Sequence, residues 1–142
     1  MVPAPKNRKE QTDELNPTSR NGSAEVLSHD MRIVLKLIDQ NRTLTIPMDR
    51  ETIIAGRTTE NFQPHLDLTG VDGSNCGVSR KHAALSYRGG DLFIEDLNST
   101  NGTLINGLQL TPGRAYMLRN GDEVELGQLR VAVNVIRIPP RA

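Results

Sequence analysis

The sequence predicts an all-β protein, an antiparallel sandwich or barrel. Short segments with a two-residue hydrophobic period recur along the chain, and turn residues separate them. No stretch of helical periodicity is long enough to connect two parallel strands. The 142 residues include no Trp, two Phe and two Tyr, so Leu, Ile and Val must form the core. This length suits one compact domain with a tail.

The domain is predicted to span residues 31–138. Residues 1–30 are polar and Pro-containing, with too few apolar side chains to offset the entropy of ordering, and we expect a disordered tail. From Met31 on, apolar and other residues alternate as in a strand with one buried face: Ile33, Leu35 and Leu37. Pro139-Pro140 ends the last strand, because proline has no backbone N–H, and leaves 139–142 as a C-terminal end.

Nine further strands are expected after the first. They cover residues 43–48, 52–55, 65–69, 83–87, 92–96, 103–105, 115–118, 123–126 and 129–138. The turns between them contain residues that accept a positive φ, namely Gly89-Gly90, Asn101-Gly102, Asn106-Gly107 and Asn120-Gly121. The intervals 58–64 and 70–77 lack strand character, and such loops on a rigid frame commonly carry binding sites.

Charge and composition exclude several classes of function. Seventeen basic residues balance seventeen acidic ones, so we expect neither nucleic acid nor a membrane surface as a partner. The single cysteine, Cys76, excludes an internal disulfide and a zinc site built on several thiolates. No signal-peptide core and no membrane-spanning run is present, which predicts a cytoplasmic protein. No cofactor is expected.

Three polar clusters lie at predicted strand ends and point to phosphate binding. They are Gly56-Arg57, residues 79–82 (Ser-Arg-Lys-His) and residues 96–103 (Asp-Leu-Asn-Ser-Thr-Asn-Gly-Thr). Together they supply a guanidinium, hydroxyls, amides and glycine-opened backbone. A phosphoryl group has three strong acceptor oxygens and is best met by an Arg fork with hydroxyl and N–H donors.

These clusters also carry a family resemblance. Gly56-Arg57, Ser79-Arg80-Lys81-His82-Ala83, the run from Asp96 to Gly107, and Leu118 with Gly121-Asp122-Val124-Leu126-Gly127 resemble the forkhead-associated (FHA) domain. Any one of these motifs alone is a weak signal, whereas four in the right order are specific. The resemblance covers residues 31 to 138 and implies an eleven-stranded β-sandwich whose loops bind a phosphothreonine peptide.

The resemblance also implies residue roles. Arg57 and Ser79 would contact the phosphate, and Arg80 would add a phosphate or peptide contact. Thr100 would donate toward the phosphate, and the Asn101 amide would pair with the ligand backbone. The expected partner is therefore a phosphothreonine-containing protein, a Ser/Thr kinase or its substrate.

Other residues of the motifs are interpreted as structural. His82 matches a buried histidine that braces the loops, and Gly56, Gly102 and Asn106 are assigned to backbone geometry. Asn98 stands where the family usually has glycine, which is tolerable because Asn enters the left-handed region more readily than most residues.

Four alternatives accompany this reading. The module could act in cis, with Thr12 or Thr18 of its own tail phosphorylated, or persist as a scaffold without a ligand. A small enzyme acting on a phosphate substrate would need a Walker-type loop, a carboxylate pair or an activated nucleophile, none of which is identifiable, so we expect no enzyme and no catalytic residue. A calcium loop over residues 67–77 lacks the ordered carboxylates of that motif.

Overall fold

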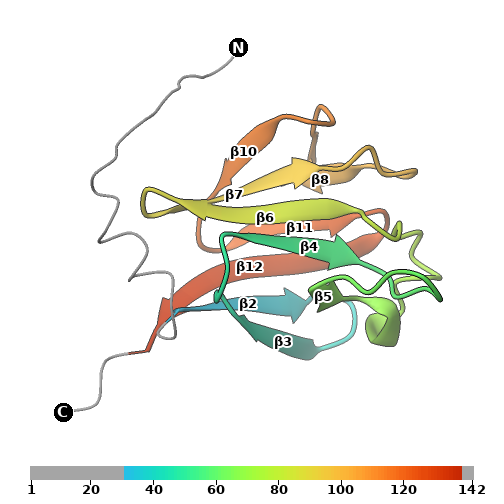
Figure 1. Cartoon of the computed structure of the whole chain (residues 1–142), viewed down its shortest axis with the longest axis horizontal. Coiled ribbons are helices and arrows are strands. Elements are labelled where there is room, and N and C mark those ends of the chain that lie inside the picture. Colours follow the sequence, from blue (N-terminus) through green and yellow to red (C-terminus); the bar gives the residue numbers. More distant parts are fainter. Residues whose placement is uncertain (1–30, 139–142) are drawn as a thin grey trace.

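The computed structural model describes residues 31–138. The expectations for the tail, including Thr12 and Thr18, and for the C-terminal end fall outside the described residues. Within 31–138 the chain forms eleven strands in two sheets that face each other (Figure 1). This confirms the predicted β-sandwich.

One sheet has five strands and the other six. The five-stranded sheet has the order β10 (Ala115–Leu118), β7 (Asp91–Asp96), β6 (Ala83–Arg88), β4 (Thr52–Gly56) and β5 (Leu66–Asp67). The six-stranded sheet has the order β3 (Arg42–Pro47), β2 (Met31–Leu37), β12 (Leu129–Arg137), β11 (Asp122–Leu126), β8 (Thr103–Ile105) and β9 (Leu108–Gln109). Neighbouring strands are antiparallel except for β4 and β5, which are parallel.

The core lies between the sheets and is almost wholly aliphatic, as the composition predicts. In β2 and β12, alternate side chains are buried while those between them are more exposed, which is the period of two expected of strands with one covered face. The largest fully buried apolar side chains are Met31, Ile33, Leu37, Met48, Leu68, Val124 and Val131. Because apolar burial is the main favourable term in folding, this core holds the loops on a rigid frame.

The structure adds two features that local patterns did not reveal. Strand β9 is two residues long, too short for a periodic signal, and pairs with β8 across the Asn106-Gly107 turn. The predicted strand 65–69 is only Leu66–Asp67, and the chain then enters a 3-10 turn, η2 (Thr69–Val71). Among residues 31–138, no helix has the length and apolar character needed to cross a membrane.

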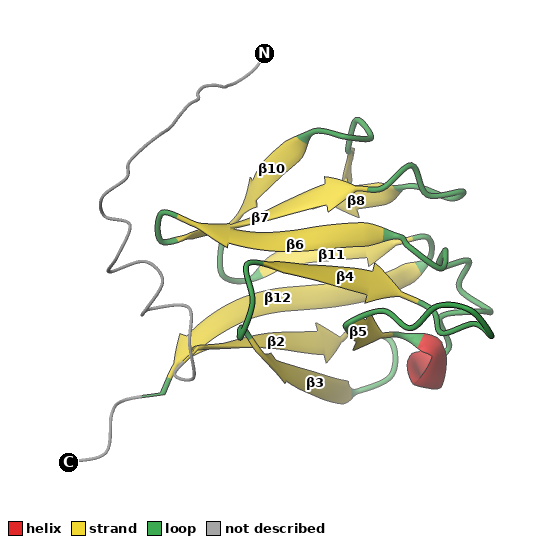
Figure 2. Cartoon of the chain, in the orientation of Figure 1, coloured by secondary structure: helices red, strands yellow, loops and turns green. Residues whose placement is uncertain are grey.

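Strand register brings the ends of β4, β6 and β7 to the same end of the sandwich (Figure 2). Ala83 at the start of β6 pairs with Ala55 of β4 on one side and with Asp96 of β7 on the other. The loops that continue from these strands therefore start side by side, although they are far apart in the sequence.

Candidate functional site

The three polar clusters form one rim of loops, which we call the loop rim and define as residues 56–58, 77–82 and 97–102. Backbone hydrogen bonds join its parts: His82 N–H donates to the Ala55 carbonyl at 2.9 Å, and Leu97 N–H donates to the His82 carbonyl at 3.0 Å. The pairing of β4, β6 and β7 is therefore continued into the loops.

Arg57 is tied to the residues on both sides of Ser79. Its backbone N–H donates to the Arg80 carbonyl at 3.1 Å, and its Nε donates to the Val78 carbonyl. Gly56 permits this close approach, because a Cβ at that position would lie 1.8 Å from the Arg80 carbonyl oxygen. The two terminal guanidinium nitrogens of Arg57 make no hydrogen bond to another of the described residues, and these are the groups suited to an anion.

The hydroxyl of Ser79 joins its own loop to the facing loop. Its Oγ accepts a hydrogen bond from the backbone N–H of Thr100 at 3.0 Å. Because this bond uses an oxygen lone pair, the hydroxyl proton remains a donor. The Thr100 side chain is exposed at the same place. Arg57, Ser79 and Thr100, predicted from separate stretches of sequence, are thus brought together.

Asn101 reaches across the rim to the loop that precedes Ser79. Its Nδ2 donates to the Gly77 carbonyl at 2.9 Å. Gly77 has a φ of 78°, and a Cβ there would lie 2.5 Å from Asn101 Nδ2, so glycine is required on two grounds. One amide N–H is used in this bond, and Oδ1 with the other N–H can face an extended ligand.

Arg80 and Lys81 are both exposed, but their surroundings differ. The Lys81 ammonium lies 5.0 Å from the centre of the Phe62 ring, within the range of a cation–π contact. No hydrogen bond, ion pair or ring contact joins the Arg80 side chain to another of residues 31–138. Lys81 is therefore engaged with an aromatic ring, whereas the Arg80 side chain is not engaged by the described residues.

His82 is fully buried and bridges two loops of the rim. Its Nδ1 accepts from the backbone N–H of Ser79, and its Nε2 lies 2.9 Å from the Gly102 carbonyl. Since a carbonyl can only accept, Nε2 carries the proton and the ring is neutral. Burial is the main reason why the pKa of His82 is lowered. His82 thus joins the loop that contains Ser79 to the loop that contains Gly102.

The lowered pKa of His82 predicts a pH-dependent stability. The unfolded chain takes up a proton near the ordinary pKa of 6.5, whereas the folded chain resists it. The contribution of His82 is therefore complete above pH 6.5 and is lost as the pH falls toward its folded pKa. We expect the free energy of unfolding, measured by urea titration, to fall between pH 8 and pH 5.5, by up to about 1.4 kcal/mol per pH unit.

A His82→Gln variant provides the reference for this measurement, because it removes the titrating ring from the bridge. The wild type should lose more stability than the variant over the same pH interval. Equal losses would show that protonation of His82 is not involved, and that other groups account for any dependence on pH.

The carboxylate of Asp96 is buried beneath the loop rim and positions one of its loops. The sequence analysis did not assign this role to Asp96. Asp96 is 1% exposed and accepts hydrogen bonds from the Ser99 N–H at 3.1 Å, the Ser99 hydroxyl at 2.6 Å and the Thr103 hydroxyl at 2.6 Å. Burial opposes ionisation, but the bonds from Ser99 and Thr103 outweigh it and lower the pKa of Asp96. The spacing Asp-x-x-Ser, typical of a side chain that closes its own turn, was the available signal.

Ser99 connects Asp96 to the residues that follow in the loop. Its Oγ accepts from the Gly102 N–H at 3.0 Å, while the Gly102 carbonyl accepts from Gly127 N–H and faces His82. Asn98 has a φ of 60°, the left-handed conformation foreseen for this position. The loop carrying Thr100 and Asn101 is thus held from below by side chains that do not themselves face a ligand.

A second group that sequence reasoning missed holds the chain just after Arg57. The carboxylate of Asp67 accepts from the Thr58 hydroxyl at 2.7 Å and from the Thr69 N–H at 2.9 Å, and Thr69 Oγ1 accepts from Thr58 N–H at 3.0 Å. Burial opposes ionisation of Asp67, but bonds from Thr69 and Thr58 outweigh it and lower its pKa. The parallel pairing of β4 with β5, which no local pattern indicated, brings these three residues together.

Asn106 contacts two residues of the neighbouring strand through its side-chain amide. Its Nδ2 donates to Asp122 at 3.0 Å, and its Oδ1 accepts from the Glu123 N–H at 2.9 Å, so that the β8–β9 turn is fastened to β11. Between residues 31 and 138, no cluster of three or more His, Cys, Asp or Glu side chains is placed to hold a metal ion.

Comparison with known proteins finds a matching family and several relatives. The family model of the FHA domain matches residues 53–127, more than half of the chain. The protein FraH of Nostoc is 34% identical over 91 residues, which is 64% of this chain and 31% of FraH. The glycogen accumulation regulator GarA of Mycolicibacterium smegmatis is 36% identical over 84 residues, covering 59% of this chain and 46% of GarA. The chain thus spans less than half the length of these two relatives.

Solved structures show the same fold. One comes from a structural and functional analysis of phosphothreonine-dependent FHA domain interactions; it is 29% identical, has a TM-score of 0.55, and the match covers 78% of this chain and 99% of that one. Another is the FhaA FHA domain complexed with the intracellular domain of Rv3910, 29% identical with a TM-score of 0.55, covering 72% of this chain and 99% of that one.

A β-sandwich whose loops gather a guanidinium, hydroxyls and amides at one end is the architecture of a binding module. The chain belongs to the FHA domain family, whose members are phosphothreonine-binding interaction modules.

Proposed function

We propose that this protein binds a phosphothreonine-containing segment of a partner protein and so acts downstream of a Ser/Thr kinase, without catalytic activity of its own. Arg57 and Ser79 grip the phosphate. The observation that carries the proposal is the bonding of Arg57 to Val78 and Arg80, which ties Arg57 to the residues on both sides of Ser79.

The remaining donors contact two parts of the ligand, its phosphate and its backbone. Arg80 adds a positive charge at the outer side of the rim, and Thr100 offers its hydroxyl next to Ser79. Asn101, which is held to Gly77 through one N–H, presents its other amide groups to the ligand backbone. Two or three charge-assisted bonds, each worth about 1.5 to 3 kcal/mol, are enough to separate phosphorylated from plain peptide.

Calorimetry tests this proposal directly. A threonine peptide selected from a phosphopeptide library should bind with roughly micromolar affinity, about −8 kcal/mol. The same peptide without phosphate should bind at least about 100-fold more weakly, because two charge-assisted bonds are lost. Equal affinity of the two peptides would refute the proposal.

A phosphoserine version of the same peptide serves as a further comparison, since it keeps the charge and changes only the side chain by one methyl group. Any difference between phosphothreonine and phosphoserine therefore reports on contacts other than those of the phosphate.

A further inference from the structure

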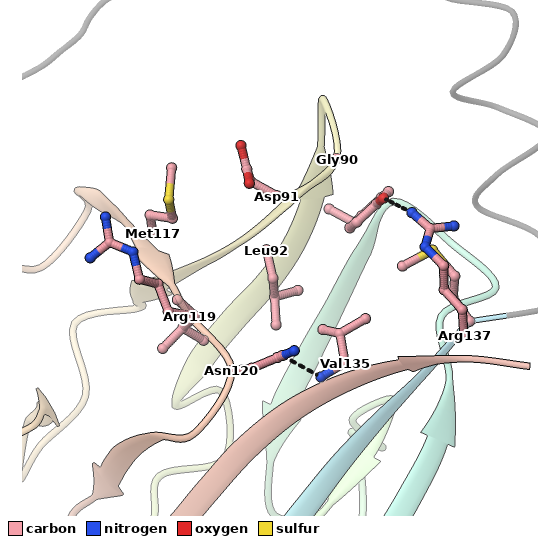
Figure 3. A pocket seen from close by; sticks show the side chains of 11 residues that line it. Gly90, Asp91, Leu92, Met117, Arg119, Asn120, Val135 and Arg137 are labelled. Atoms are coloured by element: carbon pink, nitrogen blue, oxygen red, sulfur yellow. Dashed lines mark hydrogen bonds between the residues drawn. The ribbon is translucent and has the colours of Figure 1, made fainter.

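A groove lies at the end of the sandwich opposite to the loop rim. It is bordered by the β6–β7 turn, the end of β10 and the end of β12, and has a volume of about 560 Å³. Figure 3 shows Leu92 in its middle, with Met117 and Arg119 on one side and Arg137 on the other. No residue of the loop rim lines it, so it is separate from the proposed phosphopeptide site.

The groove combines an apolar floor with a cationic border. Its floor includes Leu92, Leu118 and Val135, and Met117 is 44% exposed at its edge. Arg119 and Arg137 are exposed, and Asp91 is the one acidic residue among those lining the groove. Such a surface is complementary to a segment that has large aliphatic side chains next to carboxylates.

Two hydrogen bonds hold the walls of the groove in place. Asn120 Oδ1 accepts from the Val135 N–H at 2.8 Å and joins the β10–β11 turn to β12. Arg137 donates to the Tyr87 hydroxyl at 3.1 Å and joins β12 to β6. The Arg137 bond connects the two sheets, and the Asn120 bond fastens the turn that crosses between them, so the groove is a built feature of the fold.

The chain itself supplies a segment of the complementary kind at the border of the groove. Met31, which lines it, is the first residue of β2, and residues 24–30 directly precede it with the sequence Ala-Glu-Val-Leu-Ser-His-Asp. Val26 and Leu27 are adjacent aliphatic residues, flanked by Glu25 and Asp30. Four residues span at most about 14 Å, so Leu27 stays close to Met31 in any conformation.

We propose that residues 24–30 dock in this groove, with Val26 and Leu27 on its apolar floor and the carboxylates of Glu25 and Asp30 toward Arg119 and Arg137. Attachment at Met31 gives the segment a high effective concentration, so modest contacts suffice. The C-terminal residues 139–142, Pro-Pro-Arg-Ala, also start near the groove, but they bring a positive charge and no large aliphatic side chain.

Thermal unfolding of the full chain tests this docking. Leu27→Asp should lower the midpoint by about 4 to 8 °C, the shift that corresponds to about 1 kcal/mol in a domain of this size. Leu15→Asp is the matched control, because it makes the same change in the same tail outside the segment proposed to dock, and it should leave the midpoint unchanged. Equal midpoints for the two variants would overturn the proposal.

Hydrogen exchange of the full chain gives a second, independent readout. In the wild type, the amides of residues 26–30 should exchange at least about tenfold more slowly than those of residues 10–16, since docked amides are protected. Met117→Asp, which changes only the exposed edge of the groove, should abolish that difference. Fast exchange at residues 26–30 in the wild type would overturn the proposal.

The same variants also distinguish two other possible occupants of the groove, a second copy of the chain and residues 139–142. A dimer in sedimentation that dissociates on Met117→Asp would show that a second copy covers the groove. A fall in the unfolding midpoint on deletion of residues 139–142, without one for Leu27→Asp, would assign the groove to the C-terminal end. Either result would overturn the assignment to residues 24–30.

Discussion

Replacing Arg57 with alanine is expected to weaken binding of a phosphothreonine peptide by about 100-fold or more. Two charge-assisted hydrogen bonds to the phosphate would be lost, at a cost of about 3 kcal/mol or more, and each 1.4 kcal/mol corresponds to a factor of ten. Titration calorimetry with the phosphorylated peptide measures the effect. The plain peptide should show little difference between the wild type and the variant.

Arg88→Ala is the matched control for this experiment. Arg88 is also an exposed arginine, but it ends β6 at the opposite end of the sandwich, where its guanidinium lies 5.1 Å from the centre of the Phe93 ring. It should retain the wild-type affinity. If Arg57→Ala is folded and binds as tightly as Arg88→Ala, the guanidinium of Arg57 does not hold the phosphate.

Asp96→Asn is expected to cost about 2 to 4 kcal/mol of folding free energy. The change keeps the size of the side chain but replaces one acceptor oxygen by an NH₂ group, which then faces hydroxyls and an N–H that donated to the carboxylate. The buried donors left without a partner make this change costly. Urea unfolding at pH 7 measures it.

The exposed Asp91 at the other end of β7 offers a control, because Asp91→Asn makes the same chemical change in the same strand without burial. It should alter the unfolding free energy by less than about 0.5 kcal/mol. The Asp96→Asn variant should also bind the phosphopeptide more weakly even where it is fully folded, since Ser99 positions the Thr100–Asn101 loop. Similar stability of both variants would show that the network under the rim contributes little.

In the folded chain at neutral pH, Asp96 is charged and His82 is neutral. Protonation of either group on acidification nevertheless lowers the stability of the fold. The pKa of Asp96 is lowered below its ordinary value of 3.8 in the folded chain. Its contribution to stability is therefore present above that value and is lost as the pH falls through the folded pKa. His82 acts nearer neutrality, so the two groups weaken the rim in separate windows as the solution is acidified.

The proposed groove and the loop rim lie at opposite ends of the same strands. β6 and β7 run from the loop rim, at Ala83 and Asp96, to the groove, at Tyr87 and Leu92. A segment docked in the groove would therefore add stability to strands that carry the phosphate-binding loops without covering those loops. The tests of the two proposals are independent, because one measures peptide affinity and the other measures unfolding and exchange.

The sequence by itself determined the all-β class, most strand positions and the three polar clusters, because alternation of side chains and turn chemistry are local properties that can be recognised within a few residues. Alternating residues of β2 predicted its buried face, and the Asn106-Gly107 dipeptide predicted a turn that the structure contains. The motif order also predicted the family, which the comparisons confirm.

Only the tertiary structure decided how these parts meet. The Arg57 side chain reaches the residue before Ser79 because β4 and β6 pair in one register, and Asp67 joins Thr58 because β5 runs parallel to β4. The burial of Asp96 and the tautomer of His82 depend on partners in other loops. Such contacts are set by pairing between distant segments, and no short stretch of sequence contains that information.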